Sequence, residues 1–261
     1  MLKPLFATLL LASLASFAAE STPLTRTFAY QGKTYRTSIA PSGIFYQGMF
    51  GKTQVFTNIS VVGNYRDSAE KYDTRLFQNA AKNVSCTLEQ LGNNRVRIIS
   101  VGTVGNAKYP EAATYRQTTL FEPDRIKIDY QYTTKVPMAT HMDIFNSIMN
   151  FPLPAVVDRG LSLTDAGKKE ELLSVPAVCE KNKGLRKGGL VEVKISYPEG
   201  IFQATAGTKT NFSVKDCRSW GENNFRLDAA SLSFWKNKPE TYPAGKVWSW
   251  SVEYRFTPHE D

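Results

Sequence analysis

The stretch FSVKDCRSW, which ends at Trp220, brings together side chains that could bind a ligand. If it is a strand, Asp216 and Arg218 share a face with Phe212 and Val214, which is the apolar face. A charged pair on a core face loses its hydration, so each member needs a hydrogen-bonded partner. We therefore expect Asp216 and Arg218 to pair with each other, or to lie at the end of a sheet where a pocket opens.

Two interpretations of this stretch stay open. In the structural one, Asp216 and Arg218 form an ion pair that ties a strand end to its neighbour. In the functional one, Arg218 grips a hydroxyl or carboxylate of a ligand, Asp216 orients it, and Trp220 is a stacking wall.

Acid–base chemistry on a sugar requires two facing carboxylates, or a carboxylate and a histidine, held by different elements. His141 stands two residues before Asp143, which keeps a His–Asp pair open, although a lone histidine more often has a structural role. The catalytic candidates are therefore His141, Asp216 and Arg218. The sequence contains no Gly-x-Ser-x-Gly motif and no glycine-rich phosphate loop, which disfavours triad hydrolases and nucleotide chemistry and implies no cofactor.

Tryptophan side chains provide the flat faces on which a sugar ring can stack. Trp248 and Trp250 alternate with polar residues and share a face with Val252, which predicts that both are core residues. Trp235 precedes the polar loop KNKP and suits either a core rim or an exposed ligand platform.

The sequence contains three cysteines, Cys86, Cys179 and Cys217. All three pairings are open, and Cys179 with Cys217 is the favoured disulfide because both lie in the C-terminal half. No Cys-x-x-Cys, His-Glu-x-x-His or histidine-rich cluster occurs, so we expect no metal site.

Alternation of apolar and polar residues runs through most of the chain and predicts strands with one buried face. It is clearest over residues 125–132, 190–197 and 247–256. Turn residues separate these segments, as in Glu122-Pro123-Asp124. The pattern predicts an all-β protein, a large antiparallel two-sheet sandwich, with a few short peripheral helices at 67–79 and 164–173.

The first eighteen residues have the pattern of a cleavable signal peptide: Lys3, an apolar run from Leu5 to Leu14, then small side chains. We expect cleavage after Ala18, a single β-sandwich domain over 19–261, and a secreted or periplasmic location. No other stretch is long and apolar enough for a membrane-spanning helix.

The formal net charge is +8 at pH 7, of which the leader carries one. Such a charge raises the local concentration of anionic partners, an acidic polysaccharide among them, and also serves solubility. No nucleic-acid-binding motif is present, so nucleic acid is not an expected partner.

The C-terminal half resembles the galactose-mutarotase-like β-supersandwich domains, including those attached to polysaccharide-degrading enzymes. The resemblance lies in the layout of Gly200-Ile201-Phe202, of DCRSW at 216–220, and of PAGKVWSW at 243–250. It implies a supersandwich fold and a carbohydrate partner. Mutarotases are expected to use a His and a Glu, but neither histidine of this chain aligns with a family motif. The resemblance therefore favours sugar binding over epimerase activity.

Three hypotheses follow. The first is an exported carbohydrate-binding β-sandwich without catalytic activity. The second is a sugar-active enzyme of the aldose epimerase or polysaccharide lyase type. The third is a structural or interaction protein of the cell envelope whose basic surface docks on an anionic partner.

Overall fold

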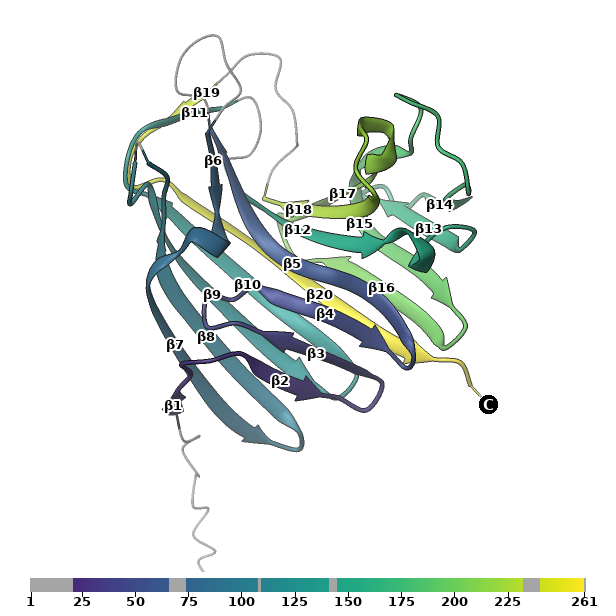
Figure 1. The fold of residues 1–261 in the computed structure, drawn as a ribbon, viewed down its shortest axis with the longest axis horizontal. Coiled ribbons are helices and arrows are strands. Elements are labelled where there is room, and N and C mark those ends of the chain that lie inside the picture. The colour runs from purple at the N-terminus through teal and green to yellow at the C-terminus, as the bar shows by residue number, and fades with distance from the viewer. Residues whose placement is uncertain (1–20, 66–73, 108, 141–144, 232–239, 261) are drawn as a thin grey trace, which may run out of the picture.

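The computed structural model describes residues 21–65, 74–107, 109–140, 145–231 and 240–260. Within them the protein is all-β, as predicted. Eighteen antiparallel strands are joined by hydrogen bonds into one continuous sheet, and two short strands form a second. The continuous sheet folds into two layers that face each other (Figure 1).

One layer, called the long sheet here, contains the strands whose alternation is clearest in the sequence. In spatial order its strands are β14 (Glu170–Ser174), β13 (Gly160–Asp165), β15 (Arg186–Tyr197), β16 (Gly200–Ala206), β20 (Val247–Pro258), β10 (Arg125–Thr134), β9 (Ala113–Glu122), β8 (Arg95–Val104), β7 (Lys82–Gly92) and β1 (Ser21–Pro23).

The other layer is called the groove sheet. Its strands are β2 (Phe28–Gln31), β3 (Tyr35–Ile39), β4 (Phe45–Phe50), β5 (Thr53–Tyr65), β12 (Phe145–Pro152), β18 (Asn224–Ala230) and β17 (Asn211–Asp216), with β6 (Thr74–Phe77) beside the end of β5. The small second sheet pairs β11 (Met138–Thr140) with β19 (Glu240–Tyr242).

β15 belongs to both layers. Its first residues pair with β17 and its later residues with β16 and β13, with a break in register between Gly188 and Leu190. Gly189 lies at this break with φ of +74°, a backbone conformation that a side chain disfavours. The bulge is the corner at which the sheet turns from one layer to the other.

The core lies between the layers and is rich in aromatic rings. Tyr35 of β3 stacks on Phe256 of β20 with ring centroids 4.5 Å apart, and Tyr132 of β10 contacts Phe145 of β12 at 4.6 Å. Trp248 and Trp250 are both buried, which confirms the prediction from alternation. Aromatic contacts of this kind add to the burial of their large apolar area.

The helix predicted over 164–173 is wrong, because these residues form the turn and second strand of the β13–β14 hairpin. Leu161 and Leu163 are both buried, a spacing that suits a strand. Asp165 accepts a hydrogen bond from the backbone N–H of Lys169 and caps a turn instead of starting a helix.

The helix predicted over 67–79 lies partly outside the described residues. The described part forms β6 and a 3₁₀ turn, η1 (Gln78–Ala80). The other 3₁₀ turns are η2 (Leu153–Ala155) and η3 (Cys217–Trp220). Among the described residues, no helix has the length and apolar character needed to cross a membrane.

Candidate functional site

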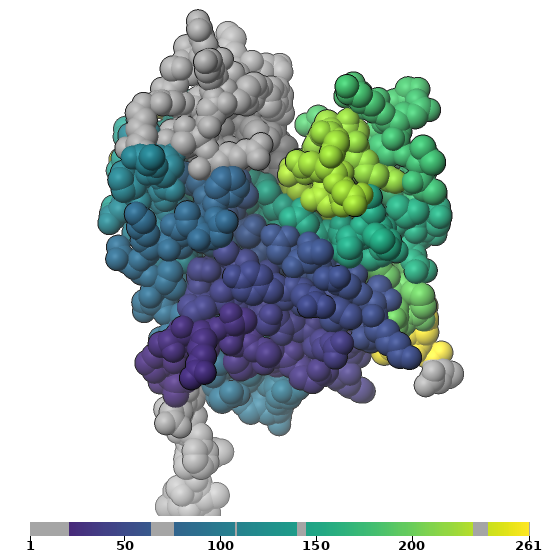
Figure 2. All heavy atoms as spheres, viewed as in Figure 1, coloured from purple at the N-terminus to yellow at the C-terminus, as the bar shows by residue number. Residues whose placement is uncertain are grey.

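A groove of about 640 Å³ runs over the outer face of the groove sheet, across β4, β5, β12 and β18. Its walls come from η1 on one side and from the segment between η3 and β18 on the other. In Figure 2 this second wall, in lime, stands beside the blue and teal surface of the groove sheet.

Three asparagine side chains form a hydrogen-bonded row on the floor. Asn150 of β12 donates to Oδ1 of Asn58 on β5 at 2.7 Å, and Asn224 of β18 donates to Oδ1 of Asn150 at 2.9 Å. The strand register produces the row, because Asn58 lies directly opposite Asn150. The Oδ1 atom of Asn224 is buried and has no hydrogen-bond partner among the described residues, so the row ends on a free acceptor.

A buried charge cluster, which we call the floor triad, continues this face. The carboxylate of Asp228 contacts Nζ of Lys215 on β17, and its Oδ1 lies 2.7 Å from Nε of Arg226. The Asp228 side chain is 1% exposed and that of Lys215 is 6% exposed, whereas 21% of the Arg226 side chain is accessible. The triad therefore carries one net positive charge and opens to the groove through Arg226.

The pKa of the Arg226 guanidinium reflects this setting. Burial disfavours its charged form, but the negative charge and hydrogen bond of Asp228 outweigh that cost and raise the pKa. Arg226 is thus held in its charged form at the groove floor. Glu222 adds an exposed carboxylate at the rim.

Two large side chains at the groove remain unusually exposed. Tyr46 on β4 is 46% exposed and Phe77 on β6 is 41% exposed, and both line the groove. The buried Gln78 anchors the wall that carries Phe77: it accepts from the backbone N–H of Val61 and donates to the backbone oxygen of Ser42. The groove thus combines aromatic faces with amides and charges.

The structure brings Asp216 and Arg218 together, but away from the groove lining. Nε and Nη2 of Arg218 donate to the two oxygens of the buried Asp216 carboxylate at 3.0 and 2.7 Å. Nη1 and Nη2 also donate to the backbone oxygens of Ala177 and Pro176. All three guanidinium nitrogens thus have acceptors within the protein, which favours the structural interpretation of the pair.

The remaining residues predicted from the DCRSW stretch lie at the same end of the groove sheet. Trp220 is 48% exposed in η3, does not line the groove, and has the guanidinium of Arg186 over its ring at 5.7 Å. The structure contains all three cysteines as free thiols, so the favoured Cys179–Cys217 disulfide is not formed in it.

His141 and Trp235 lie outside the described residues, so the structure says nothing about either. Within the described residues, no cluster of three or more His, Cys, Asp or Glu side chains is arranged to hold a metal ion.

Sequence reasoning missed the groove residues. Their signal was present as the alternation Asn224-Phe225-Arg226-Leu227-Asp228, in which every second residue is polar. The same pattern occurs on strands whose polar face is open to solvent, and the asparagines that meet on the floor come from strands distant in sequence. Only the register of β5, β12 and β18 shows that they meet.

No family model matches the sequence. A search of curated proteins likewise finds no match. Solved structures do match. The Slr1438 protein of Synechocystis sp. PCC 6803 superposes with a TM-score of 0.57 at 10% identity, covering 94% of this chain and 99% of that one.

A galactose mutarotase related enzyme of Lactobacillus acidophilus has a TM-score of 0.53 at 7% identity, covering 90% of this chain and 98% of the other. The GH36 α-galactosidase AgaA of Geobacillus stearothermophilus also gives 0.53, at 9% identity, over 90% of this chain but 41% of the enzyme. This chain therefore has the galactose-mutarotase-like fold. The similarity extends over most of the chain, beyond the C-terminal half in which the sequence resemblance lies.

Proposed function

We propose that this protein is exported, binds a carbohydrate in the groove, and does not transform it. The observation that carries the proposal is the composition of the groove: a row of asparagine amides and a buried, charged floor beside the exposed rings of Tyr46 and Phe77.

This composition matches the chemistry of a sugar. Amides and charged groups offer donors and acceptors in fixed positions for hydroxyl groups, and a buried site strengthens such bonds. An aromatic face packs against the apolar C–H face of a pyranose ring. The fold shared with a mutarotase-related enzyme agrees with a sugar ligand.

The absence of catalysis is inferred from how the groove carboxylates are held. Acid–base work on a sugar needs two groups free to accept and donate a proton on opposite sides of the reacting atoms. Both oxygens of Asp228 contact cations of the floor triad. Glu222, the exposed carboxylate of the rim, is then the sole acid–base candidate among the described lining residues.

A binding experiment tests the groove. Titration calorimetry against a panel of neutral and acidic oligosaccharides is expected to identify a ligand, and Asn150→Ala and Tyr46→Ala should each weaken it about tenfold. The control is Gln203→Ala, which removes an amide from the outer face of the long sheet. If no glycan binds the wild type, or if Gln203→Ala weakens binding equally, the groove assignment is wrong and the envelope-protein hypothesis gains.

A rate measurement tests the enzyme alternative. Polarimetry of freshly dissolved aldoses, and ultraviolet detection of unsaturated products from polysaccharides, are expected to show no acceleration over buffer. If the protein accelerates either reaction and Glu222→Gln does not, the groove is a catalytic site and the proposal of binding without catalysis is wrong.

Export is proposed from the leader alone. N-terminal sequencing of the protein from the periplasm or medium of a bacterial host should begin at Ala19. Retention of the uncleaved chain in the cytoplasm would refute this part of the proposal.

A further inference from the structure

A second depression lies on the other layer of the molecule, on the outer face of the long sheet. Its volume is about 420 Å³, and it lies over β9, β10 and β20 beside the loop that joins β16 to β17. The side chains that matter here are Arg116, Thr118, Asp129, Gln131, Lys209 and Ser251.

Strand register arranges the floor as two polar rows. Arg116, Gln131 and Ser249 are direct cross-strand neighbours, and so are Thr118, Asp129 and Ser251. Directly opposite side chains on adjacent strands lie close enough to act together. The floor is made of hydroxyls, one amide and one carboxylate, with Arg116 at a corner.

The loop at the edge is fixed on the sheet. The backbone N–H of Gly207 donates to the backbone oxygen of Ser251 at 2.9 Å, and the N–H of Ser251 donates to Oγ1 of Thr210. A Cβ at Gly207 would lie 1.9 Å from Oγ of Ser251, so a side chain at this position would have to displace the Ser251 hydroxyl. Lys209, at the tip with φ of +61°, is therefore presented by a defined turn at the edge of the depression.

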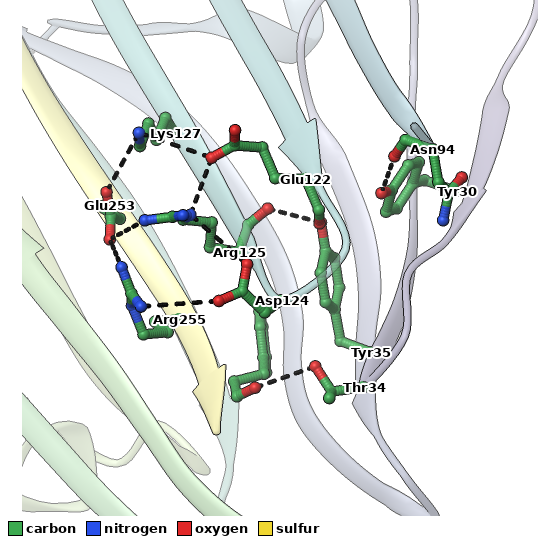
Figure 3. A network of polar contacts seen from close by, with 11 residues as sticks. Tyr30, Thr34, Tyr35, Asn94, Glu122, Asp124, Arg125, Lys127, Glu253 and Arg255 are labelled. Carbon is green, nitrogen blue, oxygen red and sulfur yellow. Dashed lines mark hydrogen bonds and ion pairs between the residues drawn. The ribbon is translucent and has the colours of Figure 1, made fainter. Parts of the chain in front are cut away.

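The cations of the depression lack partners. Neither Arg116 nor Lys209 has an ion pair or side-chain hydrogen bond within the described part of the chain. Arg116 differs in this respect from the other cations on β9, β10 and β20. At the other end of the same three strands, Arg125, Lys127 and Arg255 are all paired with carboxylates (Figure 3).

The end of the three strands at which every cation is paired can be compared with the depression. The carboxylates of this end are Glu122, Asp124 and Glu253, so three acids balance three bases. The depression holds two cations and one carboxylate, Asp129. One end of β9, β10 and β20 is therefore neutral, and the other carries an excess positive charge in a shallow hollow.

We propose that this depression binds one acidic sugar unit of an oligosaccharide, with its carboxylate or sulfate at Arg116 and Lys209. Its hydroxyls donate to the Asp129 carboxylate and bond to Gln131 and to the serine and threonine hydroxyls of the floor. The site is separate from the groove, since it lies on the opposite layer, and it gives the basic net charge of the chain a specific use.

Titration calorimetry with an α-1,4-linked tetragalacturonate, and with its fully methyl-esterified and therefore neutral form, tests the proposal. The acid should bind measurably and the ester at least tenfold more weakly. Exposed ion pairs are individually weak, so Arg116→Gln and Lys209→Gln should each lower the affinity about fivefold, and the double variant more than tenfold. Raising salt from about 20 to about 200 mM should also weaken the binding of tetragalacturonate to the wild-type protein.

The matched control is Arg97→Gln, which removes one positive charge from the same face but from an ion pair with Glu89. It should leave the affinity within twofold. Equal binding of acid and ester, or equal losses in Arg97→Gln and Arg116→Gln, would overturn the proposal. If inorganic phosphate binds as tightly as the oligosaccharide and displaces it, the depression recognises only negative charge, and the proposal of a sugar site is wrong.

The same titration separates this site from the groove. Asn150→Ala should leave tetragalacturonate binding unchanged. If Asn150→Ala abolishes binding of tetragalacturonate and Arg116→Gln does not, the acidic sugar binds in the groove. The proposal for the depression is then wrong, while the proposed function of the groove stands.

Discussion

Lys215 and Asp216 are neighbours in the chain, yet they belong to two different buried charge clusters. Lys215 lies opposite Arg226 in the strand register and joins the floor triad with Asp228 and Arg226. Asp216 ends β17 and pairs with Arg218, whose nitrogens are all taken up by protein acceptors. The first cluster carries a net charge and contributes Arg226 to the groove lining, whereas the second is neutral and its guanidinium, 15% exposed, has protein acceptors for every nitrogen.

The difference shows that burial of charge alone does not mark a binding site. What matters is whether hydrogen-bonding capacity remains after the protein has satisfied its own groups. Arg218 has little left, since it clamps the backbone at 176–177 to the end of β17. Arg226 keeps part of its surface toward the groove.

The largest expected effect is that of Asp228→Ala. It leaves Lys215 and Arg226 buried without their carboxylate, and breaking a buried pair in this way costs about 3–5 kcal/mol of unfolding free energy. Urea unfolding followed by circular dichroism measures the loss. Glu222→Ala, which removes an exposed carboxylate of the same groove, should change the free energy by less than about 0.5 kcal/mol.

Arg218→Ala should destabilise the protein somewhat less, by about 2–3 kcal/mol, because the released Asp216 can take up a proton. Its glycan affinity should equal that of the wild type, measured at a temperature where both are folded. A selective loss of affinity in this variant would show that Arg218 binds the ligand. The two charge clusters would then not differ in their roles.

Acid should act on the Asp216–Arg218 pair through the Asp216 carboxylate. Burial disfavours its charged form, but hydrogen bonds and charge from Arg218 prevail and hold the pKa below the usual 3.8. A lowered carboxylate pKa stabilises the fold above the unfolded-state value, and the contribution disappears as pH falls through the folded-state value. Urea midpoints should therefore drop less between pH 5 and pH 2 in Asp216→Asn than in the wild type; equal drops would contradict this.

A much smaller effect on stability than that of Asp228→Ala should come from replacing all three residues of the floor triad by apolar ones, Lys215→Met and Arg226→Met with Asp228→Leu, so that no charge is left without its partner. Buried ion pairs replaced by apolar side chains of similar size often leave stability within about 1 kcal/mol. The triple variant should fold and yet lose groove binding. Retained affinity would show that the floor triad serves the fold alone.

The sequence predicted the architecture because alternation reports directly which face of a strand is buried. Trp248, Trp250 and Tyr254 follow one another at every second or fourth position and all lie in the core. The same signal predicted that Asp216 and Arg218 share the apolar face of one strand; the two do pair, but β17 ends at Asp216 and Arg218 lies in η3. Local pattern was sufficient for the tryptophans, since that conclusion depends on one strand.

The groove and the depression could not be predicted in this way. The hydrogen bond between Asn58 and Asn150 joins residues 92 positions apart, and Arg116 meets Gln131 and Ser249 only through the pairing of three strands. Alternation marks a polar face, but it does not distinguish a flat solvated face from a hollow one. That distinction depends on η1, η3 and the loop at 207–210, whose placement follows from contacts distant in sequence.

The position of β20 has a consequence for the synthesis of the protein. It follows every other described strand along the chain, yet it lies inside the long sheet between β10 and β16. Until the ribosome has added residues 247–258, both of those strands keep an unpaired edge, and the core lacks Trp248 and Trp250. The nascent chain therefore cannot complete this sheet during most of elongation. The sheet can close only after its last strand has emerged, and until then the open strand edges and uncovered apolar side chains expose the chain to aggregation.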